Sequence, residues 1–538
     1  MSVPKARGAD WTEERGARNE RTSDEGRRRV QRAGGARQAL PVLRAEWVKF
    51  RTVRGWVIGM IIAALVTVGI ALLDHSECGG QVTPGGPSVV GAGCSVPIGP
   101  GGAAVSDSFY FVHRTLAGEG SITARVTALT RPGGNGPARL QPWSKAGIII
   151  KASTRPGSAY AAMLVTPGHG VRMQYDFTGD IAGLPGTVSP AAPRWLRLTR
   201  SGDTIAGYDS ADGTHWTRVG TVHLAGLAAT AQAGLFAATP GTTIPGSQSL
   251  TGSSAEGALT LATGHFDHVT LSGNSLRHGW AGTAVGGGGG PGAGFRQAGG
   301  TVTVTGTGDI APYVAAANGG TGTPIESTLT GVFAALIAVI VVAALFIAAE
   351  YRRGLIRVTF AASPARGRVL AAKAAVIGAV TFVAGLAGAA GAVVFGTALL
   401  RSNGNFILPV SALTEARVLA GAAALLAVVA TAAVAVGAIL RSGAAAVTVL
   451  IVAIVLPYLL AIALPVLPAS AAGWLLRVTP AAGFAIEQTV QRYAQVAASY
   501  TPKNGYYPLP PWAGFAVLCA WAALAVAVAV FVLRRRDA

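Results

Sequence analysis

The residues most able to do chemistry lie in a polar connection between two apolar runs, over residues 350–373. Arg352, Arg353 and Arg357 would offer charged contacts to a protein partner, while Tyr351 and Ile356 would add apolar contact. A compact polar connection can fold as a short helix between two long ones. Such an element could transmit a movement of the partner to the two long helices. The alternative is that these arginines only orient the chain in a membrane, and the two roles are compatible.

Other kinds of site have weaker support from residue spacing. Glycoside cleavage needs two carboxyl groups that flank the scissile bond, and the acidic residues of the middle region are scattered. His265 and His268 lie three apart on an expected strand, so they would point to opposite faces and could not easily share a metal ion. Cys78 and Cys94 flank a Gly/Pro-rich stretch, and both a disulfide and two separate thiols remain open.

The elements that position these residues follow from composition. Of the 538 residues, 51% are apolar and 12% are charged, whereas soluble domains carry roughly a quarter charged residues. A bilayer core needs an apolar run of roughly 17 to 25 residues to cross it as a helix. Six runs of this kind predict six transmembrane helices, over residues 56–73, 332–349, 374–400, 418–440, 444–467 and 512–533.

The distribution of basic residues predicts the orientation of these helices. The net charge is +19, and Lys and Arg cluster before the first run, between the second and third, and after the last. Because cytoplasmic flanks are rich in Lys and Arg, we expect a multi-pass protein of the cell membrane with both termini in the cytoplasm. No aromatic stripe accompanies the basic residues, so a nucleic-acid partner is not expected.

The region between the first two runs has a different pattern, with short alternating segments bounded by Gly, Pro and Asp. Ile122, Ala124 and Val126 alternate with polar residues, which predicts a strand with one buried face. Asp212 and Gly213 predict a hairpin turn. We therefore expect an extracellular all-β sandwich inserted between transmembrane helices 1 and 2.

These patterns divide the chain into six parts. They are a disordered cytoplasmic tail at 1–39, a surface helix with the first span at 40–73, a Gly/Pro-rich linker at 74–103, the sandwich at 104–273, a Gly-rich linker at 274–331, and the remaining five spans at 332–538.

The middle region resembles the concanavalin-A-like lectin/glucanase sandwich, a jelly roll. The stretches that carry the resemblance are DSFYFV (107–112), GSITARV (120–126), WSKAGIIIK (143–151), RWLRLTR (194–200), SADGTHW (210–216) and FDHVTL (266–271). That fold hosts both glycan binders and glycosidases, so it does not fix the function. Its glucanase branch carries an E-x-D-x-x-E strand that this sequence lacks. Trp143, Trp195 and Trp216 could stack on a glycan, although alternation favours core packing for some of them.

The apolar runs and their polar flanks resemble the type-2 family of ATP-binding-cassette (ABC) exporter permeases. The matching sequences are RAEWVKFRT (44–52), EYRRGLIRVT (350–359), SPAR (363–366) and AAK (371–373). In that family the first segment is an amphipathic helix on the inner membrane surface, which implies this place for Glu46, Trp47, Lys49 and Arg51. The second contains the coupling helix that docks on the ATPase, which implies partner contact by Glu350, Tyr351, Arg352, Arg353, Gly354, Ile356, Arg357 and Thr359.

This resemblance implies a transport subunit rather than an enzyme. The chain contains no G-x-x-x-x-G-K-[ST] phosphate loop, so ATP and Mg²⁺ would be bound by a separate ABC-type ATPase and this chain would hold no cofactor. A second permease copy or a paralogue would complete the pathway. The inserted sandwich departs from the family pattern and leaves the substrate open. The alternative is a membrane-anchored glycan-binding surface or sensor protein, which would have no need of a docking helix.

Overall fold

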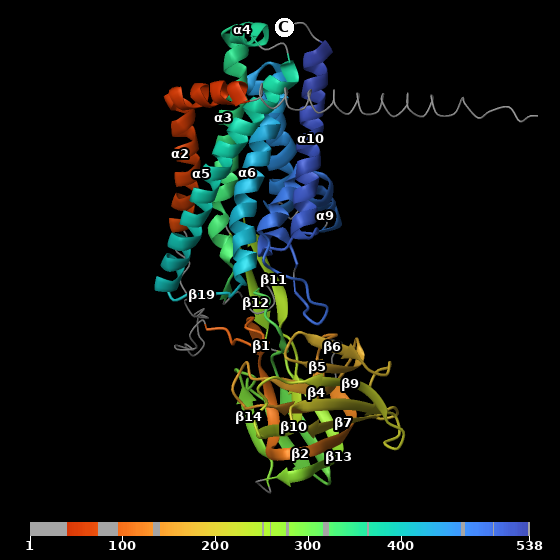
Figure 1. Ribbon diagram of the computed structural model, residues 1–538. Coiled ribbons are helices and arrows are strands. Elements are labelled where there is room, and N and C mark those ends of the chain that lie inside the picture. Colours follow the sequence, from red (N-terminus) through yellow and green to blue (C-terminus); the bar gives the residue numbers. More distant parts are fainter. Residues whose placement is uncertain are drawn as a thin grey trace, which may run out of the picture.

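The protein is described here by a computed structural model that places residues 40–73, 95–132, 140–249, 252–258, 260–275, 279–315, 322–362, 365–463, 469–498 and 500–535. Figure 1 shows a bundle of long helices with a large β domain attached at one end. The predicted combination of apolar helices with an all-β domain after the first of them is confirmed at this level. The predicted tail at 1–39 and both Cys78 and Cys94 lie outside the described residues.

Within the described residues, six helical segments are long and apolar enough to cross a membrane, and each predicted run falls on one of them. They are α2 (Arg54–Leu72), α3 (Gly331–Arg352), α5 (Arg366–Ser402), α6 (Ala412–Leu440), the segment formed by α7 (Gly443–Leu450), η2 (Ile451–Val455) and α8 (Leu456–Ala463), and α10 (Pro511–Arg535). The apolar windows of α3 and α6 are 61% buried, against 22% for α2 and α10. The helices α3 and α6 therefore form the centre of the bundle.

The two ends of the bundle differ in character (Figure 1). A helix over residues 40–52 lies across one end, crosswise to α2, and a short helix, α4 (Leu355–Ala362), projects from the same end. The last turn of α10 also lies there. Because Arg352, Arg353, Arg366 and Arg534 gather at this side, we call it the basic end. The opposite end, which carries the β domain, is the sheet end.

Small residues let α5 approach its neighbours closely. A methyl group added at Gly388 would lie 3.1 Å from the Cα of Ala64 in α2, and one added at Gly385 would lie 3.2 Å from the Cα of Ala423 in α6. Contacts this short leave little room for a larger side chain, which is the usual reason for glycine between apolar helices. These glycines therefore allow α5 to pack closely against both α2 and α6.

The fifth apolar segment changes helix type along its length. The π-helical turn η2 lies between α7 and α8, directly before Pro457. Proline has no backbone N–H and its ring clashes with the preceding turn, and a wider turn relieves that clash. The helix is therefore widened before Pro457 without being broken.

The β domain is one sheet that folds back on itself, with thirteen strands in the described part of the chain. The 22-residue strand β2 (Phe109–Thr130) belongs to both halves of the sheet. Its first half pairs with β10 (Thr230–Ala238) and β14 (Ala281–Val285), and its second half pairs with β7 (Arg194–Ser201) and β13 (Ala262–Ser275).

The other strands extend these two halves. Those that follow β10 are β3 (Lys145–Lys151), β4 (Tyr160–Thr166), β5 (Gly170–Tyr175) and β6 (Gly179–Ala182); β7 leads to β8 (Thr204–Ser210) and β9 (Thr217–His223), and β13 leads to β16 (Thr301–Gly306) and β15 (Gly294–Ala298). Side chains from both halves, among them Ile148, Met163, Leu198 and Phe266, share one apolar core.

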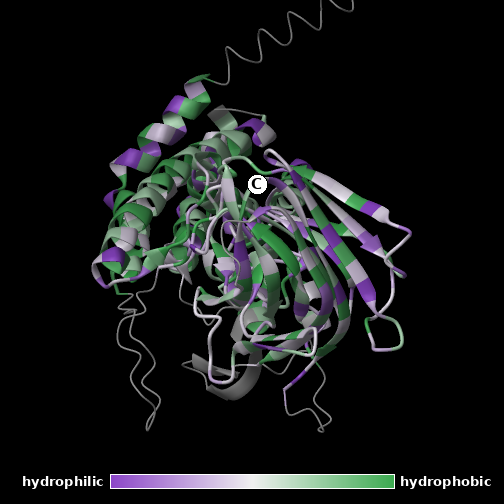
Figure 2. Cartoon of the chain, turned by 90° about the horizontal axis from the view of Figure 1, so that it is seen from below, coloured by the Kyte–Doolittle hydropathy of each residue, from purple (hydrophilic) through white to green (hydrophobic). Residues whose placement is uncertain are grey.

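The strands and turn of this domain agree with those predicted from the local sequence patterns. Ile122, Ala124 and Val126 are all fully buried on one face of β2. Asp212 and Gly213 lie in the turn between β8 and β9, and Gly213 has the positive φ of 79° that glycine adopts without strain. Figure 2 shows hydrophilic and hydrophobic residues alternating along several strands. The predicted strands and hairpin are confirmed.

The predicted linker at 274–331 is wrong over much of its length. Within it, β14 pairs with β2, β16 pairs with β13, and β17 (Ile310–Pro312) pairs with β1 (Val105–Asp107). The Gly-rich run at 286–290 was part of this predicted linker, but Gly286, Gly288 and Gly289 lie in close contact with neighbouring strands. A methyl group at Gly288 would lie 2.3 Å from the backbone nitrogen of Phe109.

The paired strands β1 and β17, which we call the strap, cover the outer face of β3. Lys151 Nζ lies 2.7 Å from Asp107 Oδ2, and Lys145 Nζ lies 2.6 Å from Asp309 Oδ1. Both lysine side chains are fully buried. Burial raises the pKa of Asp107 and lowers the pKa of Lys151, because it disfavours the charged form of each. Two buried ion pairs thus fix the strap to a central strand.

A loop from the helical part also contacts the β domain. Gln495, after the 3-10 helix η3 (Pro480–Glu487), donates from Nε2 to the carbonyl oxygens of Phe177 and Thr178 at 3.4 and 3.3 Å. Val496 packs with Ala311 and Val314 next to the strap. The β domain is therefore held by its own connections and by this second contact.

Replacing one partner of the strap ion pair should destabilise the β domain. In Lys151→Met, Asp107 keeps its burial but loses its cation, and breaking a buried pair in this way costs about 3–5 kcal/mol. The double variant Lys151→Met/Asp107→Asn removes both charges and should be less destabilised than the single one. Thermal unfolding of the detergent-solubilised chain, with hydrogen exchange of β1 and β3, measures both effects. Arg218→Met, at an exposed position of β9, is the control; equal losses in the single and double variants would contradict the ion-pair account.

Candidate functional site

Four charged side chains meet at the basic end, and we call them the charge junction: Glu46, Lys49, Glu350 and Lys373. Lys373 Nζ lies 2.6 Å from both Glu46 Oε2 and Glu350 Oε1. Lys49 Nζ lies 2.8 Å from Glu46 Oε1 and 3.0 Å from Glu350 Oε1. The four charges balance, and they join the helix over 40–52 to the end of α3 and the first turns of α5.

Helix geometry explains how the charge junction is assembled. Glu46 and Lys49 lie three residues apart and so share one face of their helix. Phe50 continues this buried face and packs edge-on against Phe346 of α3, with ring centres 6.0 Å apart. Lys373 Nζ lies 4.9 Å from the centre of the Phe346 ring. Aromatic packing therefore closes the charge junction on the side of α3.

The burial of the charge junction makes its parts interdependent. The Lys373 side chain is 0% exposed, and the side chains of Glu46 and Glu350 are 1% and 7% exposed. A buried charge is tolerated only when it is paired, because taking an ion out of water costs several kcal/mol. Any movement that separated these helices would leave at least one of the ions unpaired. The three helices should therefore move together at this point.

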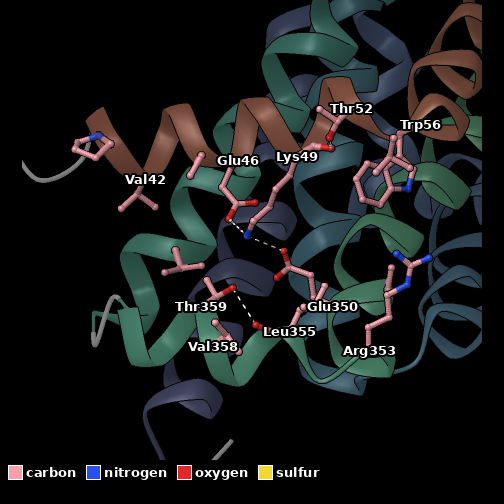
Figure 3. A pocket seen from close by; sticks show the side chains of 15 residues that line it. Val42, Glu46, Lys49, Thr52, Trp56, Glu350, Arg353, Leu355, Val358 and Thr359 are labelled. Atoms are coloured by element: carbon pink, nitrogen blue, oxygen red, sulfur yellow. Dashed lines mark hydrogen bonds and ion pairs between the residues drawn. The ribbon is translucent and has the colours of Figure 1, made fainter.

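A groove lies beside the charge junction, between the helix over 40–52 and α4 (Figure 3). Its volume is about 550 Å³. Trp56, Leu355 and Val358 supply apolar lining, while Lys49 and Glu350 of the charge junction lie inside it. Leu355 and Val358 are 48% and 67% exposed. The groove therefore offers apolar area beside a few charged groups.

The residues predicted to contact a partner divide into two sets. Arg352, Arg353 and Gly354 are exposed, and Arg353 lines the groove together with Thr359. Gly354 has a φ of 67° and makes the turn from α3 into α4. These positions suit the predicted contact, whereas the side chain of Arg357 lies outside the described part of the structure.

The other set points into the protein. Glu350 belongs to the buried charge junction, and Ile356 is buried. Tyr351 lies under Arg441, whose Cζ is 5.6 Å from the ring centre. Leu355 and Val358 were not predicted, and they line the groove together with Glu350. Their spacing of three on a short helix was the available signal, because such residues share one face.

The helix over 40–52 has one face buried against the bundle and one face exposed. Glu46 and Phe50 face the bundle and are buried, whereas Trp47 and Arg51 are exposed. Lys49 reaches the charge junction while keeping part of its side chain exposed. Glu46 and Lys49, which were expected at the membrane surface together with Trp47 and Arg51, also hold the helix to the bundle.

Three tryptophans of the β domain differ in how much of the side chain is exposed. Trp143 is buried and stacks on His169 with ring centres 3.8 Å apart. Trp195 and Trp216 are partly exposed, and Arg197 Cζ lies 3.8 Å from the ring centre of Trp216. The described residues contain no group of three or more His, Cys, Asp or Glu side chains that could hold a metal ion.

Comparisons with known proteins identify no family for this chain. No family model matches it, and no curated protein matches it. One similar solved structure is a functionally unknown protein from Saccharomyces cerevisiae, with 15% identity over 33% of this chain and 82% of that chain, and a TM-score of 0.20. Another is scytalido-glutamic peptidase with a transition state analog inhibitor, with 11% identity over 38% of this chain and 100% of that chain, and a TM-score of 0.23.

A third is the GH43 protein BlXynB from Bacillus licheniformis, with 18% identity over 22% of this chain and 24% of that chain, and a TM-score of 0.16. Similarities with TM-scores this low carry no argument about the fold or the function of the chain.

Loss of the central cation should release the helix over 40–52. In Lys373→Met, Glu46 and Glu350 would share Lys49 alone, and an incompletely paired buried charge costs about 3–5 kcal/mol. We expect a lower unfolding temperature and faster hydrogen exchange across residues 40–52. Arg401→Met, at an exposed position near the other end of α5, is the matched control. Unchanged exchange in residues 40–52 of the Lys373 variant would show that the charge junction does not hold this helix.

Proposed function

We propose that this chain is the permease subunit of an ATP-driven exporter of the type-2 ABC kind, working with a separate ATPase. The observation that carries this proposal is the position of α4, which projects beyond the long helices with exposed Leu355 and Val358 beside the charge junction. A protein that used its helices only as an anchor would have no need of such an element. The substrate is not indicated by these features.

The arrangement of the basic end supports its placement in the cytoplasm. Lys and Arg are enriched on cytoplasmic flanks of membrane helices. A helix with aromatic and basic residues on its open face suits the interface between lipid and water, and Trp47 and Arg51 are exposed on the helix over 40–52. In this orientation both ends of the described chain lie in the cytoplasm, and the β domain lies outside the cell.

The contacts around α4 provide a route for mechanical coupling. Glu350 lies in the last turn of the helix before α4, and Lys373 lies near the start of the helix after it. Both belong to the charge junction, which also holds the helix over 40–52. A push on α4 would therefore reach three helices together. The partner surface should combine an apolar ridge for the groove with carboxylates for Arg352 and Arg353.

The same proposal assigns the outer domain to the concanavalin-A-like jelly-roll class. It also implies a second permease copy or a paralogue, because six spans make half a pathway in the resembled family.

The alternative function, a membrane-anchored glycan-binding surface or sensor protein, is favoured by one observation. Trp195 and Trp216 are partly exposed, and exposed aromatic rings can stack on sugars.

The deciding experiment is affinity purification of the tagged full chain from its own host in mild detergent, followed by mass spectrometry. We expect an ABC-type ATPase in stoichiometric amount. The double variant Arg353→Glu/Val358→Glu should lose it, because it places negative charge on the basic and apolar parts of the proposed contact. The variant Arg401→Glu, at the opposite end of α5, should retain the ATPase. A clean preparation without any ATPase, in conditions that preserve known transporters, would favour the glycan-binding alternative.

A further inference from the structure

The ion pair between Lys151 and Asp107 is completely enclosed by the β domain. Both side chains are 0% exposed, and Lys151 Nζ lies 2.7 Å from Asp107 Oδ2. The rings of Tyr160 and Phe177 lie beside the ammonium group, with centres 5.6 and 5.4 Å from Nζ. The pair therefore lies in an enclosed site with aromatic walls, between β3 and the strap.

This enclosure favours the uncharged form of both groups. Burial raises the pKa of Asp107, and its effect exceeds the opposing effects of Lys151 and of the Gly157 N–H. Burial also lowers the pKa of Lys151, and here it exceeds the opposing charges of Asp107 and Asp176. A proton can pass from Nζ to the carboxylate along their 2.7 Å hydrogen bond. The result is a neutral amine beside a neutral carboxylic acid, the two reactants of amide formation.

The two oxygens of Asp107 have different surroundings. Oδ2 accepts hydrogen bonds from Lys151 Nζ and from the backbone N–H of Gly157, each at 2.7 Å. Within the described part of the chain, no donor reaches Oδ1. Gly157 has a φ of 84°, which glycine adopts without strain. A fixed N–H at Oδ2 would stabilise the negative charge that this oxygen gains when an amine attacks the carboxyl carbon.

We propose that Lys151 and Asp107 form an intramolecular isopeptide bond between Nζ and the side-chain carboxyl carbon. Nζ attacks this carbon, and Oδ1 leaves as water after it has taken the carboxyl proton and one hydrogen of the amine. The amide nitrogen keeps one hydrogen, and no oxidant or cofactor is consumed. Because folding already holds the two groups in contact, the entropy cost that slows the reaction between separate molecules does not arise.

The second buried pair of β3 provides a comparison within the same chain. Lys145 Nζ lies 2.6 Å from Asp309 Oδ1, but the Asp309 side chain is 11% exposed. Water can therefore solvate this carboxylate, and an amine does not attack a solvated carboxylate. We expect Lys145 and Asp309 to remain an ion pair.

The isopeptide bond would join the strap covalently to a central strand. Asp107 and Lys151 are 44 positions apart, so the closed ring of the chain would contain the whole of β2. A cross-link of this size restricts the unfolded chain and thereby favours the folded one. The inference concerns the β domain alone. It goes beyond the proposed function and requires neither the ATPase nor the membrane orientation.

The test is mass spectrometry of the purified full chain. The intact wild type should be lighter than the mass of its sequence by one water. After digestion, tandem spectra should identify a branched peptide that joins Asp107 to Lys151, whereas Lys145 and Asp309 should appear in unlinked peptides. In denaturing electrophoresis the closed ring should also make the wild type migrate faster than a variant without the bond.

Three variants make the result specific. Lys151→Arg keeps a positive charge opposite Asp107, but a guanidinium group stays protonated and cannot attack, so this variant should have its full sequence mass. Lys151→Met/Asp107→Asn avoids the larger arginine side chain and should also contain no branched peptide. Arg218→Met, at an exposed position of β9, should lose one water as the wild type does.

Two results would overturn the proposal. One is a wild type of full sequence mass, with Asp107 and Lys151 in separate unmodified peptides. The other is a loss of water that persists in Lys151→Arg. Such a loss would belong to another site, for example a succinimide at Asp212 and Gly213, which yields no branched peptide. Neither result would alter the recovery of an ATPase in the purification described above, so the two proposals can fail separately.

Discussion

The buried ammonium group of Lys373 is the constraint on which the basic end depends. It lies 2.6 Å from carboxylate oxygens of two other helices, and none of its side chain reaches the surface. Since an isolated charge in such a place would cost several kcal/mol, Glu46 and Glu350 must stay beside it. The helix over 40–52 is thereby fixed to the bundle, and the groove beside α4 keeps its shape. The shape of the groove is therefore a consequence of ion pairing inside the protein.

The β domain also contains buried ion pairs between lysine and carboxylate groups. Lys145 and Lys151 are buried at the two ends of β3. Lys151 is paired with Asp107 of the strap, and Lys145 is paired with Asp309, which directly precedes β17. In both cases a lysine on an internal element binds carboxylates from segments remote in sequence. Such pairs add little net stability compared with apolar packing, but they specify which segments meet. They explain why these particular segments lie together, because apolar patterns alone would not decide which segments pair.

Sequence patterns predicted the parts of this structure that depend on neighbours in the chain. The apolar runs gave the long helices because length and hydropathy are local properties, and the alternation at Ile122, Ala124 and Val126 gave a strand for the same reason. The pairing of Glu46 with Lys373 joins residues 327 positions apart and has no local signal. The strands at 281–312 were missed because the glycines between them resemble a tether when their close contact with β2 is unknown.

The two ends of the bundle are connected through α3. At the sheet end, Tyr313 follows the strap, and its hydroxyl group accepts a hydrogen bond from Gly322 N shortly before η1 (Ile325–Leu329) and α3. At the basic end, Glu350 in the last turn of α3 belongs to the charge junction. Because α3 is a continuous helix at the centre of the bundle, an axial displacement at Glu350 would be carried along α3 toward η1 at the sheet end. A β domain attached in this way would follow the movements of the helices, which distinguishes it from a domain that is only tethered to an anchor.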